Sequence, residues 1–168
     1  MKNLLFVIMA ISIIACNEQT KVEEDKGIAN SERINGLYDA FAAGDVDTVL
    51  ANFTEDIQWS EAENFIYDYG EPLVGADAVV EGVFAKLGSE WEYWNLEEKE
   101  FFDVGEDRVL VTGRYQAKNK ASGKELDAQF AHVWTLRDTL VLSFQQYTDT
   151  KQAAEVVMVD EPVESEEE

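Results

Sequence analysis

The chain has 168 residues, of which 35 are acidic and 13 are basic, and its formal net charge is −22 at neutral pH. A surface this negative repels phosphate backbones, so nucleic acid is excluded as a partner. The single cysteine excludes an internal disulfide, and the single histidine leaves too few nitrogen ligands for a zinc site. We therefore expect no metal and no other cofactor.

The first residues predict an export signal. Lys2 precedes an apolar run over 4–15, which is too short to span a bilayer comfortably. The run ends in "IIAC", which resembles the bacterial lipobox. The resemblance implies that 1–15 is a lipoprotein signal peptide, removed before Cys16, whose thiol then carries the lipid. Asn17 stands where an aspartate is associated with inner-membrane retention, which favours a cell-envelope protein anchored in the outer membrane.

Polar segments flank the candidate domain. Residues 16–30, the lipidated cysteine and a polar tether, would hold the domain away from the membrane. Residues 155–168 include "DEPVESEEE", a run of like charge that predicts an acidic disordered tail. The remaining residues, 31–154, are long enough to bury one core and are expected to form one domain.

Three segments in the first half of this domain have helical patterns. Apolar residues over 34–41 recur at intervals of three and four, which predicts a helix that ends before Gly44. A short second helix is expected over 46–53, with Asp45 as its N-cap. The spacing of valines and phenylalanine predicts a third helix over 76–87.

Strand patterns begin with the alternation over 56–61 and continue from Trp91 onward. Turn residues divide the second half into four runs, at 91–104, 108–118, 124–137 and 140–149. Sequential strands with short connections predict an antiparallel meander. We therefore expect an α+β fold in which three N-terminal helices pack on a strongly curved antiparallel sheet, as a half-open cone with an apolar interior.

Four stretches, in this order and spacing, resemble the NTF2-like superfamily and within it the SnoaL-like domains, relatives of the ketosteroid isomerases. The stretches are "YDAFAAGDVDTVLANFTEDIQW", "LVGADAVVEGVF", "GKELDAQFAHVWTLRD" and "SFQQYTDT". The resemblance covers 34–150 and implies an NTF2-like cone. The superfamily includes isomerases, cyclases, hydrolases and binding modules, so the fold does not define the activity.

The resemblance to ketosteroid isomerases points to candidate catalytic positions. Those enzymes combine an aspartate base with an oxyanion hole made by a tyrosine and a protonated aspartate. The base position falls on Glu61, and the position of the second aspartate falls on His132. The tyrosine position falls on Leu37, which has no hydroxyl, although Tyr38 is its neighbour. Steroid-type isomerisation is therefore not implied.

The resemblance to SnoaL-type cyclases is also partial. Those enzymes carry a pocket histidine at the position of His132, but their acid–base aspartate falls on Gln146. An amide side chain cannot take up a proton in a useful pH range, so cyclase chemistry in its usual form is not expected.

Inward-facing residues of three strands are expected to form one pocket with aromatic walls. Glu61 and His132 are its candidate catalytic pair; the alternative is that they satisfy each other as a buried polar pair. Tyr67 and Tyr69 lie on the loop after Glu61, either as a lid or as surface anchors. The candidate pocket residues are Tyr38, Trp59, Phe130, Trp134, Phe144, Gln146, Thr148 and Asp149, the last of which could instead cap a turn.

Three hypotheses follow. In the first, the envelope lipoprotein binds a small, largely apolar molecule in the cone. In the second, it is an isomerase, a cyclase or a hydrolase-like lyase that uses Glu61 as base and His132 as donor. In the third, it is a non-catalytic module that forms a homodimer through the outer face of the sheet.

Overall fold

The computed structural model describes residues 28–160. The predicted signal peptide, Cys16, most of the tether and the acidic tail from residue 161 lie outside the described residues.

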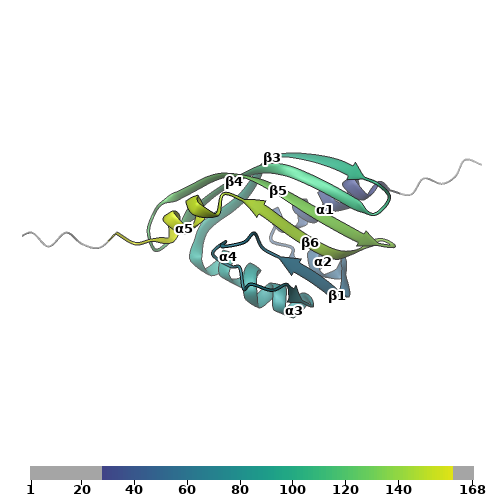
Figure 1. The fold of residues 1–168 in the computed structure, drawn as a ribbon, viewed down its shortest axis with the longest axis horizontal. Helices are drawn as coiled ribbons and strands as arrows, with labels where there is room; N and C mark the ends of the chain where they lie inside the picture. The colour runs from purple at the N-terminus through teal and green to yellow at the C-terminus, as the bar shows by residue number, and fades with distance from the viewer. Residues whose placement is uncertain (1–27, 161–168) are drawn as a thin grey trace, which may run out of the picture.

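One strongly curved sheet of six strands forms the centre of the fold, in the order β2-β1-β6-β5-β4-β3 (Figure 1). The four long strands β3 to β6 are sequential antiparallel neighbours, as the alternating pattern predicts. The bounds are β1 Phe53–Ser60, β2 Leu73–Val74, β3 Trp91–Val104, β4 Arg108–Asn119, β5 Glu125–Arg137 and β6 Leu140–Thr148.

The direction of β1 differs from the expectation of a purely antiparallel sheet. β1 lies parallel to β6, with Trp59 opposite Phe144, and pairs antiparallel only with the short β2. The sheet is therefore mixed. Side-chain alternation identifies a strand but carries no information on its direction relative to a distant partner, and the long connection from β1 to β6 permits a parallel pairing.

The helices lie mainly where the sequence predicts them. They are α1 (Asn30–Ala42), α2 (Val46–Ala51) and a third helix composed of α3 (Ala76–Val79), η1 (Val80–Phe84) and α4 (Ala85–Glu90). The turn between α1 and α2 uses Gly44 at φ 73°, and the Asp45 side chain accepts a hydrogen bond from the Thr48 amide. In Figure 1, α1 and α2 lie behind β5 and β6, and the third helix runs beside β1.

The middle of the third helix, η1, is a turn of π-helix. Tyr69 donates a hydrogen bond from its hydroxyl to the Gly82 carbonyl at 3.1 Å, outside the helical pattern. A Cβ atom at Gly82 would lie 2.6 Å from a methyl carbon of Leu73, so the glycine allows β2 to approach the helix closely. π turns are often found at functional sites, and Val83 and Phe84 of this turn line the cavity described below.

A fourth helix, α5 (Thr150–Val157), was not predicted and extends three residues past the expected domain end at 154. Asp149 is its N-cap, because its carboxylate accepts a hydrogen bond from the Gln152 amide at 3.0 Å. Ala153 and Val156 are buried, so the helix packs on the domain. The first residues of the predicted tail therefore belong to the fold.

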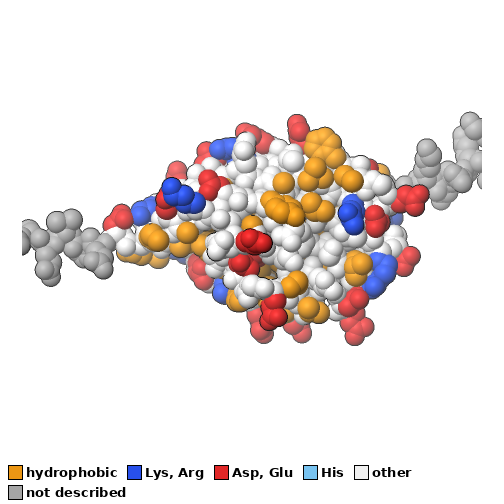
Figure 2. Space-filling view, viewed as in Figure 1, with side chains coloured by type: hydrophobic (Ala, Val, Ile, Leu, Met, Phe, Trp, Pro, Cys, Tyr) orange, Lys and Arg blue, Asp and Glu red, His pale blue; other side chains and the backbone are white. Residues whose placement is uncertain are grey.

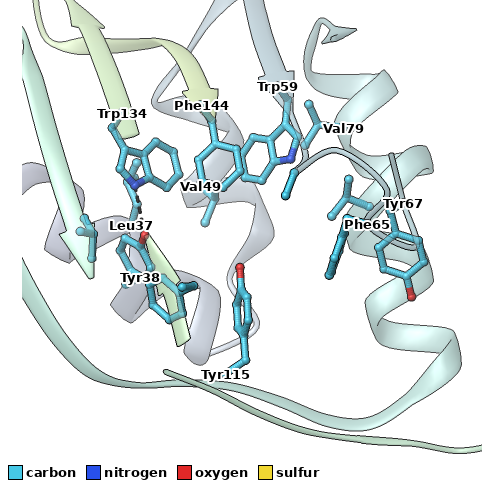
Figure 3. Packing of buried hydrophobic residues seen from close by; sticks show 14 of the residues in the cluster. Leu37, Tyr38, Val49, Trp59, Phe65, Tyr67, Val79, Tyr115, Trp134 and Phe144 are labelled. Carbon is cyan, nitrogen blue, oxygen red and sulfur yellow. Dashed lines mark hydrogen bonds between the residues drawn. The ribbon is translucent and has the colours of Figure 1, made fainter. Parts of the chain in front are cut away.

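The core fills the space between the concave face of the sheet and the helices, and much of it is aromatic (Figure 3). Ile34, Val79 and Val111 are fully buried and come from α1, α3 and β4, so helices and sheet share one interior. None of the helices in residues 28–160 is both long enough and apolar enough to cross a membrane.

Candidate functional site

A cavity of about 70 Å³ lies inside the cone. Its inner wall comes from the sheet, including Trp59, His132 and Gln146, and its other wall comes from α1 and the third helix. The half-buried side chains of Phe41, Phe84, Leu87, Trp94 and Leu96 also line it. The predicted hollow between sheet and helices therefore exists, but it is narrow.

Aromatic rings form the sheet side of this cavity. The rings of Trp59 and Phe144 stack with their centroids 3.8 Å apart, and Trp134 meets Phe144 edge-on at 4.6 Å. These residues come from three adjacent strands, β1, β6 and β5, and Figure 3 shows their rings side by side. Because each of the three rings packs against the other two, they form a rigid apolar surface that suits a flat, apolar ligand.

His132 is held between two tyrosine hydroxyls. The Tyr38 Oη lies 2.6 Å from Nδ1, and the Tyr115 Oη lies 2.6 Å from Nε2. Tyr38 also accepts a hydrogen bond from the Trp134 indole Nε1 at 3.1 Å, the contact drawn as a dashed line in Figure 3. Both ring nitrogens of His132 are thus occupied by protein groups.

A second chain of contacts continues from Tyr115 to the end of β1. The Gln146 Nε2 donates to the Tyr115 hydroxyl at 2.9 Å, and its Oε1 accepts from the Ala62 amide at 3.3 Å. The backbone amide can only donate, so it fixes which end of the Gln146 side chain faces Tyr115. Gln146 is therefore an orienting group, consistent with the loss of the acid–base position there.

Burial controls the protonation of the central groups. Desolvation lowers the pKa of His132 to about 3, so the imidazole is neutral at physiological pH. Desolvation also raises the pKa values of Tyr38 and Tyr115 well above the usual value for tyrosine, so both phenols keep their protons. The site thus contains a neutral histidine and two neutral tyrosines.

Glu61 has one satisfied and one free oxygen. Its Oε1 accepts a hydrogen bond from the Trp59 indole Nε1 at 2.7 Å, while its Oε2 is buried without a partner among the described residues. Burial raises its pKa to about 7, with a smaller contribution from the nearby charge of Asp68. A buried carboxyl with a free oxygen and a pKa near neutrality can accept or release a proton, or receive a hydrogen bond from a ligand.

Glu61 and His132 both line the cavity, but they do not form the buried pair considered from the sequence. The His132 nitrogens contact tyrosines, and Glu61 contacts Trp59. A direct ion pair would raise the pKa of the histidine and lower that of the glutamate; both pKa values move the other way, because desolvation dominates each group.

Of the predicted pocket residues, Tyr38, Trp59, Trp134, Phe144 and Gln146 line the cavity. The other three do not, and their assignment to the pocket is corrected as follows. Phe130 is buried beneath the site, where its ring stacks on His132 at 4.2 Å. Thr148 donates its hydroxyl to the Gln129 carbonyl, and Asp149 caps α5.

The sequence pattern does not single out Tyr115, although its hydroxyl contacts His132. It lies on β4 in the alternating series Val109, Val111, Gly113, Tyr115, Ala117, in which every residue except Gly113 is buried. Two small residues, Gly113 and Ala117, flank the tyrosine in this series and weaken its apolar signal. The period of two was the available signal, since it places Tyr115 on the same face as Val111.

The two loop tyrosines have different positions. Tyr67 is buried and lines the cavity; its hydroxyl donates to Glu90 at 2.8 Å and accepts from the Trp91 indole at 2.8 Å. Tyr69 is 48% exposed, and the Lys86 ammonium lies 5.3 Å and 5.1 Å from the ring centres of Tyr67 and Tyr69. These contacts fasten the loop after Glu61 to the third helix.

Comparison with known proteins gives the family. The model of the SnoaL-like domain matches residues 34–144. The chain belongs to the SnoaL-like domain family. The resemblance seen in the sequence is thus confirmed, together with the α+β cone that it implies.

Solved structures similar to this SnoaL-like domain include proteins of several descriptions. An NTF2-like protein from Burkholderia thailandensis is 27% identical, with a TM-score of 0.72, and the match covers 78% of this chain and 98% of that one. TerC, co-crystallised with polyporic acid, is 26% identical, with a TM-score of 0.66 and coverage of 76% and 96%. A protein called a polyketide cyclase, from Pseudomonas putida, is 17% identical, with a TM-score of 0.69 and coverage of 79% and 100%; it shows the fold alone. No curated protein matches the sequence.

Within residues 28–160, the SnoaL-like domain brings no group of three or more His, Cys, Asp or Glu side chains together as metal ligands. The polar groups of the cavity are thus a carboxyl, an amide, an imidazole and phenols. Such groups can hydrogen-bond a ligand or move a proton.

Proposed function

We propose that the cone binds a small, largely apolar molecule that carries a polar group. The observation that carries this proposal is the free, buried Oε2 of Glu61, a residue that lines a largely apolar cavity. An unpaired buried oxygen costs free energy, and a ligand that hydrogen-bonds it recovers that cost. The structural neighbour TerC, which was co-crystallised with polyporic acid, supports the use of this fold for ligand binding.

The size of the cavity limits this ligand. Its volume of about 70 Å³ is roughly half that of the engineered cavity of about 150 Å³ that holds benzene. The part of the ligand that enters the cone is therefore a few heavy atoms. A larger ligand has to extend past the half-buried rim at Phe41, Phe84 and Leu87.

Native mass spectrometry of the full chain purified from cells tests this binding. We expect a retained small molecule in the wild-type protein, and its loss in Leu87→Trp, which narrows the rim. Val104→Trp is the matched control, since Val104 is exposed and does not line the cavity. Retention by Leu87→Trp at the wild-type level would contradict binding in this cavity.

Proton transfer by Glu61 is a second candidate function, because its pKa of about 7 is close to the optimum for a general base. The donor in such an enzyme is a tyrosine, because His132 is enclosed between Tyr38 and Tyr115. Glu61→Gln separates the two functions: it abolishes turnover of a substrate that the wild-type chain converts, whereas a pure binding protein shows no turnover in either form.

We also propose that the domain is attached to the bacterial envelope, most simply to the outer membrane, through a lipid on Cys16. The support is the "IIAC" motif with its single cysteine. Cys16→Ala should abolish incorporation of labelled fatty acid and move the protein from the membrane fraction to the soluble fraction. Unchanged labelling would refute lipidation at Cys16.

We also propose that two copies of the chain form a homodimer through the outer face of the sheet. Phe102 of β3 lies opposite Leu110 of β4, which in turn lies opposite Val133 of β5, so the register forms an apolar row across three strands. Phe102, Val104 and Tyr147 are 46%, 48% and 56% exposed. Figure 2 shows hydrophobic side chains gathered on this face among charged groups.

A further inference from the structure

The hydrogen atoms around His132 can be counted. Trp134 can only donate, so it uses one lone pair of the Tyr38 oxygen; the Gln146 amide, oriented by Ala62, uses one lone pair of the Tyr115 oxygen. A neutral imidazole has one N–H and one lone pair. It therefore donates to one tyrosine and accepts from the other.

One hydroxyl hydrogen is left over by this count. The tyrosine that receives the histidine N–H already accepts two hydrogen bonds, so its own O–H has no partner among the described contacts. If Nδ1 carries the proton, the free hydroxyl is that of Tyr38. If Nε2 carries it, the free hydroxyl is that of Tyr115.

Electrostatics favours Tyr115 as the free donor. The charge of Glu61 acts on the Tyr115 hydroxyl and contributes to its raised pKa, whereas no such contribution of Glu61 reaches Tyr38. An ionised Glu61 attracts the positive end of the Tyr115 O–H bond and so favours the Nε2–H tautomer of His132. Figure 3 shows the Tyr115 hydroxyl directed toward the Trp59 and Phe144 rings. Trp59 is also the residue whose indole N–H binds Glu61.

We propose that Tyr115 O–H and Glu61 Oε2 together bind the polar group of the ligand by hydrogen bonds, and that this group is a hydroxyl. This inference rests on the proposed binding function. A hydroxyl accepts a hydrogen bond from Tyr115 and donates one to the Glu61 carboxylate, so it completes both free positions. A carbonyl can only accept, so it leaves the carboxylate without a partner. His132 acts as a positioning residue that keeps the Tyr115 hydrogen available.

Propan-2-ol and acetone are suitable probes, because each is small enough for the cavity, they have nearly the same size and shape, and they differ in the donor. The indole N–H signals of Trp59 and Trp134 report binding by NMR titration, since both rings line the cavity. At about pH 8.5, where Glu61 is ionised, we expect the alcohol to bind about tenfold more tightly than the ketone, as is typical for one hydrogen bond to a charged group.

Glu61→Gln provides the sharpest test. The Trp59 indole needs an acceptor, so the glutamine oxygen takes the place of Oε1 and its NH₂ group takes the place of the free Oε2. The position then donates instead of accepting. We expect the preference to reverse in favour of acetone by roughly threefold or more.

Tyr115→Phe should weaken binding of both probes about tenfold. Tyr147→Phe is its matched control, since Tyr147 is exposed on the outer face and should leave both dissociation constants unchanged. If Tyr38→Phe weakens both probes while Tyr115→Phe does not, the free donor is Tyr38 and the assignment is overturned.

The failures of the two proposals are distinguishable. If neither probe shifts the indole signals of the wild-type chain, the binding function itself fails. If both probes bind the wild-type chain equally, and Glu61→Gln does not change their ratio, the cavity binds small molecules but does not select a hydroxyl. In that case only the present inference is overturned.

Discussion

Glu61 and His132 line the same cavity, and burial moves their pKa values toward their neutral forms, to about 7 and about 3. Their effects on stability oppose each other. Between about pH 4.5 and 6.5, the folded state binds an extra proton at Glu61 and lacks one at His132, relative to the unfolded chain. Over this range the two contributions to the pH dependence of stability largely cancel.

Replacing the Glu61 carboxyl should therefore show how much its ionisation lowers the free energy of unfolding. The free energy of unfolding of the wild-type chain contains a penalty for ionising Glu61 that is absent below about pH 4.5 and complete above about pH 7, where it approaches about 3 kcal/mol. Glu61→Gln should match the wild-type chain in urea unfolding near about pH 4 and exceed its stability by about 1–3 kcal/mol near about pH 8. Equal stability at the higher pH would show that Glu61 is not desolvated.

The sequence shows which side of a strand faces the core, but not how deep along the strand a residue lies. Phe130, His132 and Trp134 share one face of β5, yet only the last two reach the cavity. The prediction that Thr148 lines the cavity is wrong for the same reason. Thr148 lies on the same face of β6 as Gln146, but beyond the cavity along the strand. The hydrogen bonds of His132 depend on residues that lie 17 and 94 positions away, so no local pattern could identify them.

At the scale of elements, Gly113 shows how β4 accommodates the site. A Cβ atom there would lie 2.5 Å from the Phe130 ring and 2.8 Å from the Glu97 carbonyl oxygen. Glu97 borders an irregularity in the pairing of β3 with β4, where Glu98 has φ 52°. The absent side chain thus lets Phe130 lie flat beneath His132.

Gly113→Ala should destabilise the chain by about 1–3 kcal/mol, because the methyl group meets backbone as well as ring. Gly36→Ala is the matched control: it lies in α1, where a methyl group would meet no heavy atom within 4 Å, and should stabilise the chain by about 0.5–1 kcal/mol. Thermal unfolding compares the two. Destabilisation of similar size in both would contradict this account of the contact.

A substitution at Asp149 tests whether this residue only caps α5 or also contributes to ligand binding in the cavity. Asp149→Ala removes the N-cap and should cost about 1 kcal/mol in the free energy of unfolding, measured with urea, while the affinity for propan-2-ol stays unchanged. Glu155→Ala, on the exposed side of the same helix, should change stability by less than about 0.5 kcal/mol. A loss of affinity in Asp149→Ala would restore Asp149 to the ligand site.

The elements were predicted where their patterns are strong. The stripe of α1 and the alternation of β4, β5 and β6 indicated the correct type and nearly correct bounds. α5 was missed because its eight residues contain only two buried side chains, Ala153 and Val156, next to a strongly acidic segment. The parallel pairing of β1 with β6 depends on the path of the whole chain, which local periodicity does not record.

At the scale of the whole molecule, the order and spacing of the elements, together with the family resemblance, predicted the cone, because three helices can cover one face of the meander if the sheet curls around them. The volume of the hollow could not be predicted. It depends on how the rings of Trp59, Trp134 and Phe144 pack, and a shift of one ring is enough to open or fill about 70 Å³.

The proposed dimer brings two opposing forces together. Apolar side chains at Phe102, Val104 and Tyr147 favour association, whereas a net charge of −22 per chain repels a second copy. Salt screens the repulsion and leaves the apolar contact almost unaffected, so dimerisation should strengthen with ionic strength.

Sedimentation velocity of the unlipidated Cys16→Ala chain can measure this balance. We expect mostly monomer in about 0.02 M NaCl and dimer in about 0.5 M NaCl, where the screening length falls to a few ångströms. Phe102→Asp adds charge at the exposed β3 end of the apolar row and should keep the chain monomeric at both salt concentrations. Ile28→Asp, exposed next to the start of α1, should behave as the unsubstituted chain. A monomer at every salt concentration would refute the homodimer through the outer face. A dimer that weakens as salt is added would mean that charge pairs, and not the apolar row, hold the two copies together.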